Sequence, residues 1–394
     1  MIYDAIVIGG GPAGGTSALL LAKAGWSVAV VEKATFPRRK VCGEFISATT
    51  LPLLEGLGVA ESFLGMAGPE VRRVGFFAGE TVVSAPMPQT RGGRFRWGHA
   101  LGREHLDLIV LDAAVKAGAE LFQPFTAADL AHDGQNYRCR ITSDGESRDL
   151  IGRVVIAANG SWERGPLSPK TPPHRDSDLL GFKAHFKGAS LPGDLMPMLV
   201  FRGGYAGLVH TDGGRVSLSC CIRRDQLKKS RAALPGHSAG EAVLQHIASS
   251  CRGAREALAS ASVDGPWLSA GPIRPGIHKA ARDGTYFTGN MAGEAHPIIA
   301  EGISMAIQSA WLLSRRLIAS RPEAARDLGG SIRTAYERDW KRLFGPRVRA
   351  SMALNMILTG PGAAQIAGQV VRLLPSALTF GARVAGKATT VPTT

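Results

Sequence analysis

A glycine-rich turn near the N-terminus restricts the fold of this chain more than any other feature. Ala5 to Ile8 is a short apolar run, typical of a buried parallel strand, and it leads directly into Gly9-Gly10-Gly11-Pro12-Ala13-Gly14. An alanine- and leucine-rich stretch continues to Ala24, where a glycine stops it. Ser27 to Val31 is a second apolar run that ends on Glu32, 23 residues after Gly9. This order of strand, turn, helix, strand and acid predicts a Rossmann-like unit that binds a dinucleotide.

The residues of the turn have separate physical roles in such a unit. Gly9 permits the tight turn, Gly11 lets the backbone approach a pyrophosphate, and Gly14 allows the helix to pack closely on the strand. The helix N-terminus then faces the phosphates, and the carboxylate of Glu32 accepts hydrogen bonds from ribose hydroxyls. An acid at this position disfavours a 2′-phosphate, so the nucleotide is expected to be FAD or NAD rather than NADP.

Composition limits the class of protein and its partners. The 394 residues are 45% hydrophobic and 20% charged, as in a chain that buries a core. The net charge of +14 favours an anionic partner such as nucleic acid, a lipid surface or a phosphate-bearing ligand. The five cysteines have no CxxC spacing, which indicates a reducing compartment and no metal site. No apolar run approaches the roughly 20 residues of a spanning helix, and no cationic leader begins the sequence, so a cytoplasmic, unprocessed chain is expected.

Further motifs are needed to distinguish FAD from NAD, and they follow in a fixed order. They are a helix from Gly102-Arg103 to a stop at Gly118, a strand at Val154 to Ala157 that ends on Asn159-Gly160, a segment from Tyr286 through Gly289-Asn290 to His296-Pro297, and a helix that begins at Gly302.

With these motifs the chain resembles the FAD-dependent group that joins hydroxylases of the para-hydroxybenzoate hydroxylase type, flavin-dependent halogenases and geranylgeranyl reductases. The late motif of that group has a proline eight residues and a glycine thirteen residues after its first glycine, as Gly289, Pro297 and Gly302 do here. The resemblance implies that Arg103 lies by the pyrophosphate and that residues 290–302 surround the ribityl chain and the flavin ring. The expected cofactor-binding residues are Gly9, Gly11, Pro12, Ala13, Gly14, Glu32, Lys33, Lys40, Cys42, Arg103, Gly160, Gly289, Asn290, Pro297, Gly302 and Ile303.

The chain departs from the pattern of the group at three positions. Asn290 stands where the group has an aspartate that contacts the ribityl hydroxyls, and Ala300 stands where a glycine is usual. Asn159 precedes Gly160 where Asp-Gly is common. Asparagine keeps an acceptor and adds a donor, so FAD binding is expected to survive. Ala300 is expected to narrow the flavin pocket by about a methyl group.

The loop between Phe36 and Phe45 allows two interpretations. Its basic triplet Arg38-Arg39-Lys40 either meets FAD phosphates or forms part of a solvated loop. Cys42 resembles the cysteine of the Cys-Gly-Glu motif of geranylgeranyl reductases, where that residue faces the flavin pocket. The alternative for Cys42 is a small buried thiol. His296, beside Pro297 in the expected flavin loop, is a second catalytic candidate because an unperturbed histidine titrates near pH 6.5.

The expected fold is α/β, with an inserted antiparallel sheet and a helical end. Alternating apolar residues between glycine turns predict the sheet. Its candidate substrate residues are Phe201, Tyr205 and His210, each of which could equally be an ordinary sheet residue. The domains are a discontinuous Rossmann-like FAD-binding domain (1–75, 100–170 and 277–330), a substrate domain (76–99 and 171–276), and a basic amphipathic C-terminal segment (331–394).

The C-terminal segment holds half of the excess positive charge of the chain. Residues 331–394 contain nine Lys and Arg against two acidic residues. Apolar stretches between these charges predict amphipathic helices that cap the substrate pocket, lie on an anionic membrane surface, or pack on the core with solvated basic faces. Nucleic acid is disfavoured, because no recognised binding module is present.

The favoured reaction is hydroxylation of a hydrophobic aromatic or polyketide-like molecule by an FAD-dependent monooxygenase, through a flavin C4a-hydroperoxide. The alternative is a reductase that saturates C=C bonds of an isoprenoid or lipid, which Cys42-Gly43-Glu44 and Glu301-Gly302-Ile303 favour by resemblance. A second GxGxxG is absent, so NADPH or NADH is expected as a transient reductant. A halogenase is less favoured, because the sequence has no Trp-x-Trp-x-Ile-Pro motif. The least favoured hypothesis is a non-enzymatic flavin-binding scaffold.

Overall fold

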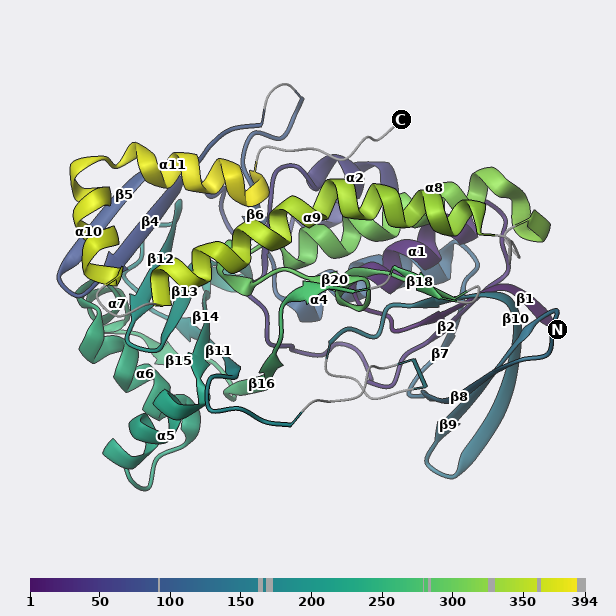
Figure 1. Cartoon of the computed structure of the whole chain (residues 1–394), viewed down its shortest axis with the longest axis horizontal. Coiled ribbons are helices and arrows are strands. Elements are labelled where there is room, and N and C mark those ends of the chain that lie inside the picture. The colour runs from purple at the N-terminus through teal and green to yellow at the C-terminus, as the bar shows by residue number, and fades with distance from the viewer. Residues whose placement is uncertain are drawn as a thin grey trace.

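Two large sheets form the framework of the protein (Figure 1). The computed structural model describes residues 1–90, 93–161, 166–167, 173–278, 280–282, 285–324, 330–359 and 363–387. The first sheet comprises β1 (Ile2–Ile8), β2 (Val28–Val31), β7 (Glu120–Phe122), β8 (Thr126–His132), β9 (Tyr137–Ser143), β10 (Glu146–Ala157), β18 (Ala281–Arg282) and β19 (Thr285–Phe287).

The first sheet confirms the predicted parallel βαβ unit. Strand β1 lies between β2 and β10 and is parallel to both. Alternate residues of β1 face opposite sides, so Val7 packs with helices and Ile6 packs with the β8–β9 hairpin. The helices of this part are α1 (Pro12–Lys23), α2 (Leu51–Leu57), α3 (Ala60–Leu64), α4 (Arg103–Lys116) and α8 (Gly302–Ala324). Helices α4 and α8 both contact α1, the helix that follows the glycine turn.

The second sheet confirms the predicted antiparallel strands of the insertion. It comprises β4 (Arg73–Ala78), β5 (Thr81–Pro86), β11 (Leu179–Lys187), β12 (Leu195–Phe201), β13 (Gly204–His210), β14 (Val216–Arg223), β15 (Ser262–Val263) and β16 (Leu268–Ile273). One pair, β4 with β12, is parallel. Strand β4 begins at Arg73, so this insertion starts earlier than the expected boundary at residue 76.

Each face of the second sheet has a different cover. Phe182, Ala184 and Phe186 of β11 pack in an apolar cluster with α5 (Arg224–Ala233), α6 (Ala239–Ser250) and α7 (Arg252–Leu258). The residues between them, Lys183 and His185, face the first part of the chain. Short pairs join the two parts, namely β3 (Phe45–Ile46) with β6 (His99–Ala100) and β17 (Gly276–Ile277) with β20 (Gly293–Glu294).

The C-terminal segment is helical, as predicted. It consists of α9 (Ser331–Thr359), α10 (Ala363–Leu373), α11 (Ser376–Ala382) and a π-helical turn, η4 (Arg383–Lys387). Helix α9 runs along α8, and α10 and α11 lie against β4 and β5 at the far edge of the second sheet (yellow in Figure 1). None of the helices that the structure describes is both long and apolar enough to cross a membrane.

Candidate active site

The glycine turn leaves open space in front of helix α1. Gly9 has a φ of 103°, and a Cβ on Gly14 would lie 1.7 Å from the carbonyl oxygen of Gly9, so both positions require glycine. Among the described residues, a Cβ on Gly11 would come near only one group, the Arg103 guanidinium at 3.4 Å. Helix α1 begins at Pro12, and no side chain in the described part of the chain caps it. The N–H groups of Ala13 and Gly14 therefore remain available at a helix N-terminus, where an anion is stabilised.

Glu32 is fixed at the end of β2, as the sequence predicted. Its buried carboxylate accepts hydrogen bonds of 2.8 Å from the backbone N–H groups of Gly10 and Ala34. Arg38 lies 3.5 Å from the same carboxylate. One member of the basic triplet is therefore an ion-pair partner of Glu32 and is not a solvated side chain.

A pocket lies where β1 and β2 end, and Val31 and Lys33 are among the residues that line it. Lys33 lines it together with Gly9 and Asn159, and Phe125 contributes an apolar wall. Lys40 lies nearby, because its Nζ is 3.8 Å from the point that a Cβ on Gly160 would occupy. The structure thus places Lys33, Lys40 and Gly160 at one edge of the parallel sheet.

Arg103 is a fixed cation at the mouth of the turn. Two hydrogen bonds of 2.6 Å join its guanidinium to Asp107, one helical turn along α4. Burial alone would lower the pKa of Arg103, but the Asp107 carboxylate raises this pKa above its usual range. The side chain also lies beside Gly11 and the thiol of Cys42.

The segment 289–294 packs directly on the glycine turn. Gly289 has a φ of 58°, and its added Cβ would lie 3.1 Å from Cβ of Ala13. The Asn290 amide donates to Ser161 Oγ at 2.8 Å, and that hydroxyl donates to Glu294 at 2.8 Å. Burial raises the pKa of Glu294 to about 7. Glu294 lies within the motif at residues 289–302 but was not among the predicted site residues.

Tyr205 and His296 were selected separately, and the structure brings them together. The Tyr205 hydroxyl lies 3.0 Å from His296 Nδ1, and both side chains are buried. Burial lowers the pKa of His296 to about 4, so the ring is neutral at pH 7. Burial also raises the pKa of Tyr205 well above 10, so the hydroxyl keeps its proton. Because Nδ1 faces this donor, we assign the ring proton to Nε2, which has no partner among the described residues.

The rest of the loop combines open and buried positions. Pro297 and Gly302 are exposed, and a Cβ on Gly302 would meet nothing within 4 Å. Ala300 adopts a φ of 49°, a conformation that glycine accepts without strain. The Ile303 side chain is packed in the main apolar core, so a cofactor contact of this residue would be made by its backbone.

Lys387 from the C-terminal segment holds this loop in place, and sequence reasoning missed it. Its Nζ donates to the carbonyl oxygens of Ile299 and Ala300, both at 2.9 Å, and to the Glu301 carboxylate at 2.6 Å. Burial lowers the pKa of Lys387, and the Glu301 charge opposes that change. The lysine therefore satisfies the carbonyl groups of a strained turn.

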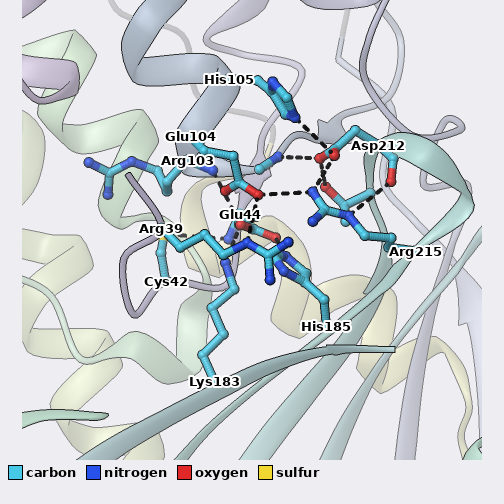
Figure 2. Close-up of polar contacts among 12 residues, drawn as sticks. Arg39, Cys42, Glu44, Arg103, Glu104, His105, Lys183, His185, Asp212 and Arg215 are labelled. Atoms are coloured by element: carbon cyan, nitrogen blue, oxygen red, sulfur yellow. Dashed lines mark hydrogen bonds and ion pairs between the residues drawn. The ribbon is translucent and has the colours of Figure 1, made fainter. Parts of the chain in front are cut away.

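A buried ion cluster joins the Cys42-Gly43-Glu44 turn to the second sheet. Figure 2 shows Lys183 and His185 pointing from β11 toward Glu44. Lys183 donates to one carboxylate oxygen of Glu44, and His185 Nε2 lies 2.8 Å from the other. Burial alone would raise the pKa of Glu44, but His185 and Lys183 lower it to about 2. The sequence analysis quoted Glu44 only as part of a motif and gave it no partner.

A second ion cluster lies beside the first (Figure 2). Arg215 donates to Glu104 at 3.0 Å and also to Asp212. Arg39 lies 3.3 Å from Glu104, so this arginine, too, pairs with acids. Glu104, His105 and Asp212 are close enough to hold a metal ion, but Arg215 pairs with both acids and Arg39 pairs with Glu104.

Comparison with known proteins shows a family match for the N-terminal part of the chain and distant relatives over nearly its full length. Residues 2–170 match the family model of an FAD binding domain. The chain is 26% identical to conditioned medium factor receptor 1 of Dictyostelium discoideum over 91% of this chain and 71% of that protein. It is 23% identical to menaquinone reductase of Mycolicibacterium smegmatis over 98% of this chain and 92% of that protein. It is also 23% identical to digeranylgeranylglycerophospholipid reductase 2 of Methanopyrus kandleri over 91% of this chain and 87% of that protein.

The match assigns residues 2–170 to the FAD binding domain family. Solved structures share the fold of nearly the whole chain. The myxobacterial chondrochloren halogenase CndH has a TM-score of 0.77 at 19% identity, and the alignment covers 96% of this chain and 90% of the halogenase. A geranylgeranyl bacteriochlorophyll reductase-like protein from Thermoplasma acidophilum has a TM-score of 0.74 at 18% identity, with 96% of this chain and 91% of that protein covered.

Two predicted substrate residues of the flavoprotein lie away from Tyr205 and His296. Phe201 faces the opposite side of the second sheet, where its ring packs against His246 of α6. His210 lies at the other end of β13, roughly 17 Å from Tyr205 at 3.3 Å per residue, and its Nε2 bonds to the Leu191 carbonyl at 2.8 Å. Alternation within a strand predicts which residues share a face, but it does not predict which face meets the cofactor.

Proposed function

We propose that FAD lies along the line from the pocket at Lys33, past Gly11 and Arg103, to the loop around His296. Three observations support this placement. The position of a Gly11 side chain is open, the α1 N-terminus is uncapped, and His296 Nε2 is a buried donor without a partner among the described residues. When bound and reduced by an external donor, FAD would supply the redox chemistry as a hydride with its electron pair.

We propose further that the flavoprotein reduces a C=C bond of a hydrophobic, isoprenoid-like substrate. Both reductase relatives named above align over more than nine-tenths of this chain. Ala300, in the loop around His296, packs in a cluster of apolar residues that come partly from the second sheet. Apolar residues of this kind suit an apolar substrate. These residues are Phe45, Val71, Val74, Met87, Trp97, Met196 and Val209.

The Tyr205–His296 pair is the observation that carries this proposal. Reduction of C=C adds a hydride to one carbon and a proton to the other, and the two electrons come from an external donor such as NADPH or NADH. In this proposal His296 Nε2–H would give the proton while the Tyr205 hydroxyl passes its own proton to Nδ1, so the ring stays neutral and Tyr205 is reprotonated afterwards. Tyr205 also holds the ring in this orientation before the transfer.

Product mass tests the proposed reaction. Purified protein is incubated with NADPH or NADH and a panel of prenyl lipids, prenylated quinones and alkyl phenols, and the products are analysed by mass spectrometry. We expect a gain of two hydrogens on a prenyl substrate. A gain of one oxygen instead would support the monooxygenase, and protein without flavin absorbance would contradict FAD binding itself.

Monooxygenation of an aromatic substrate is the second candidate. The enclosed loop favours it, because His296, Ile299 and Glu301 are all buried. An enclosed site from which water is excluded would suit hydroxylation.

The Tyr205→Phe variant should retain FAD and reduce its substrate about 100-fold more slowly, because the proton would lose its fixed position on the His296 ring. The rate of flavin reoxidation by substrate without oxygen measures this step. Tyr3→Phe is the matched control, since the Tyr3 hydroxyl bonds to Glu120 on the first sheet. Equal rates for Tyr205→Phe and wild type would remove Tyr205 from the mechanism.

A further inference from the structure

We propose that the C-terminal face binds the surface of an anionic lipid bilayer. We define this face as the exposed apolar side chains of the last helices, namely Met356, Ile366, Val370, Leu373, Leu374, Phe380 and Val384. The inference goes beyond the reaction and does not depend on whether the flavoprotein reduces or hydroxylates its substrate.

Helix α10 has apolar residues on two sides. Val371 is buried against Phe76 and Val200 of the second sheet, so one side is the ordinary packed side of a surface helix. Ile366, Val370 and Leu373 are 68%, 48% and 85% exposed, and Leu374 follows at 57%. These four positions have the spacing i, i+4, i+7 and i+8 and form a second stripe. A helix with only core contacts would have polar residues there.

The same apolar character continues beyond α10. Phe380 of α11 is 65% exposed, and Val384 of η4 is 50% exposed. Among the described residues, eight of the fourteen large hydrophobic side chains that are exposed lie between Met352 and Val384. Figure 1 shows α10 and α11 at the outer edge of the second sheet, where a flat surface could reach them. Such a concentration of exposed apolar side chains indicates an interaction surface.

The positive charge of this segment indicates which kind of partner binds the C-terminal face. Residues 340–394 contain seven Lys and Arg and no Asp or Glu, and two of the seven, Arg347 and Lys387, are buried. Arg372 and Arg383 are exposed, and each is the chain neighbour of an exposed apolar residue, Leu373 or Val384. Arginine stems can lie on the acyl boundary while the guanidinium groups meet lipid phosphates. Pairing two copies of this face would instead bring these arginines together without acids from the same segment.

Vesicle co-sedimentation tests the proposal with the holoprotein. We expect binding to vesicles of equal parts phosphatidylcholine and phosphatidylglycerol, weaker binding to phosphatidylcholine alone, and loss of the difference at high salt. The triple variant Ile366→Ser/Leu373→Ser/Phe380→Ser should bind anionic vesicles at least about tenfold more weakly, since each change removes apolar area from the contact. Arg372→Gln/Arg383→Gln should also weaken anionic binding about tenfold or more.

The matched control changes exposed apolar residues elsewhere. Val115 on α4 and Val263 on β15 are 41% and 44% exposed, and Val115→Ser/Val263→Ser should bind vesicles like wild type. All variants should keep their flavin absorbance, which separates loss of binding from loss of fold. The proposal would be overturned if the wild-type protein did not bind anionic vesicles. It would also be overturned if the triple variant bound them as tightly as wild type. A wild-type dimer that the triple variant converts to a monomer would overturn it as well.

Discussion

Replacing Gly11 with valine will give a folded protein that has lost its FAD. The new side chain enters the open space in front of α1, because a Cβ at this position meets only the Arg103 guanidinium, at 3.4 Å, among the residues that the structure describes. That space is where the cofactor pyrophosphate is expected. We expect the dissociation constant for FAD to rise at least about 100-fold, which corresponds to about 2.7 kcal/mol. Titration of the apoprotein with FAD, followed by flavin fluorescence, measures the change.

Two other glycine-to-valine variants make this experiment specific. Gly14→Val should lose FAD and also unfold at a lower temperature, because its Cβ would clash with the Gly9 carbonyl oxygen. Gly381→Val should keep FAD, since a Cβ at this position on α11 meets nothing within 4 Å. If Gly11→Val retained full FAD occupancy, the pyrophosphate would have to bind elsewhere.

Replacing Glu44 with glutamine will destabilise the fold more than most single substitutions. The change leaves Lys183, whose side chain is 1% exposed, without its carboxylate partner. Removing one member of a buried pair costs about 3 kcal/mol or more. Thermal unfolding in saturating FAD, followed by circular dichroism, measures the loss. Glu61→Gln is the matched control, because the Arg94–Glu61 pair is exposed and should contribute little.

A double variant and a pH series identify the cause of this loss. Glu44→Gln/Lys183→Met removes both charges and should recover much of the stability. The pKa of Glu44 falls from 4.5 to about 2 on folding, so its contribution is complete above pH 4.5 and is lost as pH falls toward 2. Wild type should therefore lose more stability over this interval than Glu44→Gln. Equal acid sensitivity of the two proteins would show that Glu44 does not contribute in this way.

Local sequence patterns predicted the elements well and their long-range partners poorly. The glycine turn and the alternation of β11 depend on neighbouring residues, so the βαβ unit and the inserted sheet could be predicted. Glu44 and Lys183 are 139 residues apart, and nothing near either residue specifies the other. The alternation of β11 shows that Lys183 and His185 share a face, but only the tertiary structure shows that this face is buried.

The candidate site shows the same limit. Tyr205 and His296 were each selected for their chemistry and position in a motif, yet their contact depends on how the second sheet sits on the cofactor loop. Phe201 has equally suitable chemistry and lies on the other side of the sheet. Lys387 could not be found from the sequence, because the surrounding residues resemble an ordinary basic amphipathic helix.

The contact between Lys387 and residues 299–301 also has a consequence for biogenesis. The glycine turn at residues 9–14 emerges early from the ribosome, whereas Lys387 follows Gly14 by 373 residues. The nascent chain can therefore fold its nucleotide-binding half long before the opposite end of the site receives its final hydrogen bonds. FAD captured during translation would first be held by its adenosine end alone.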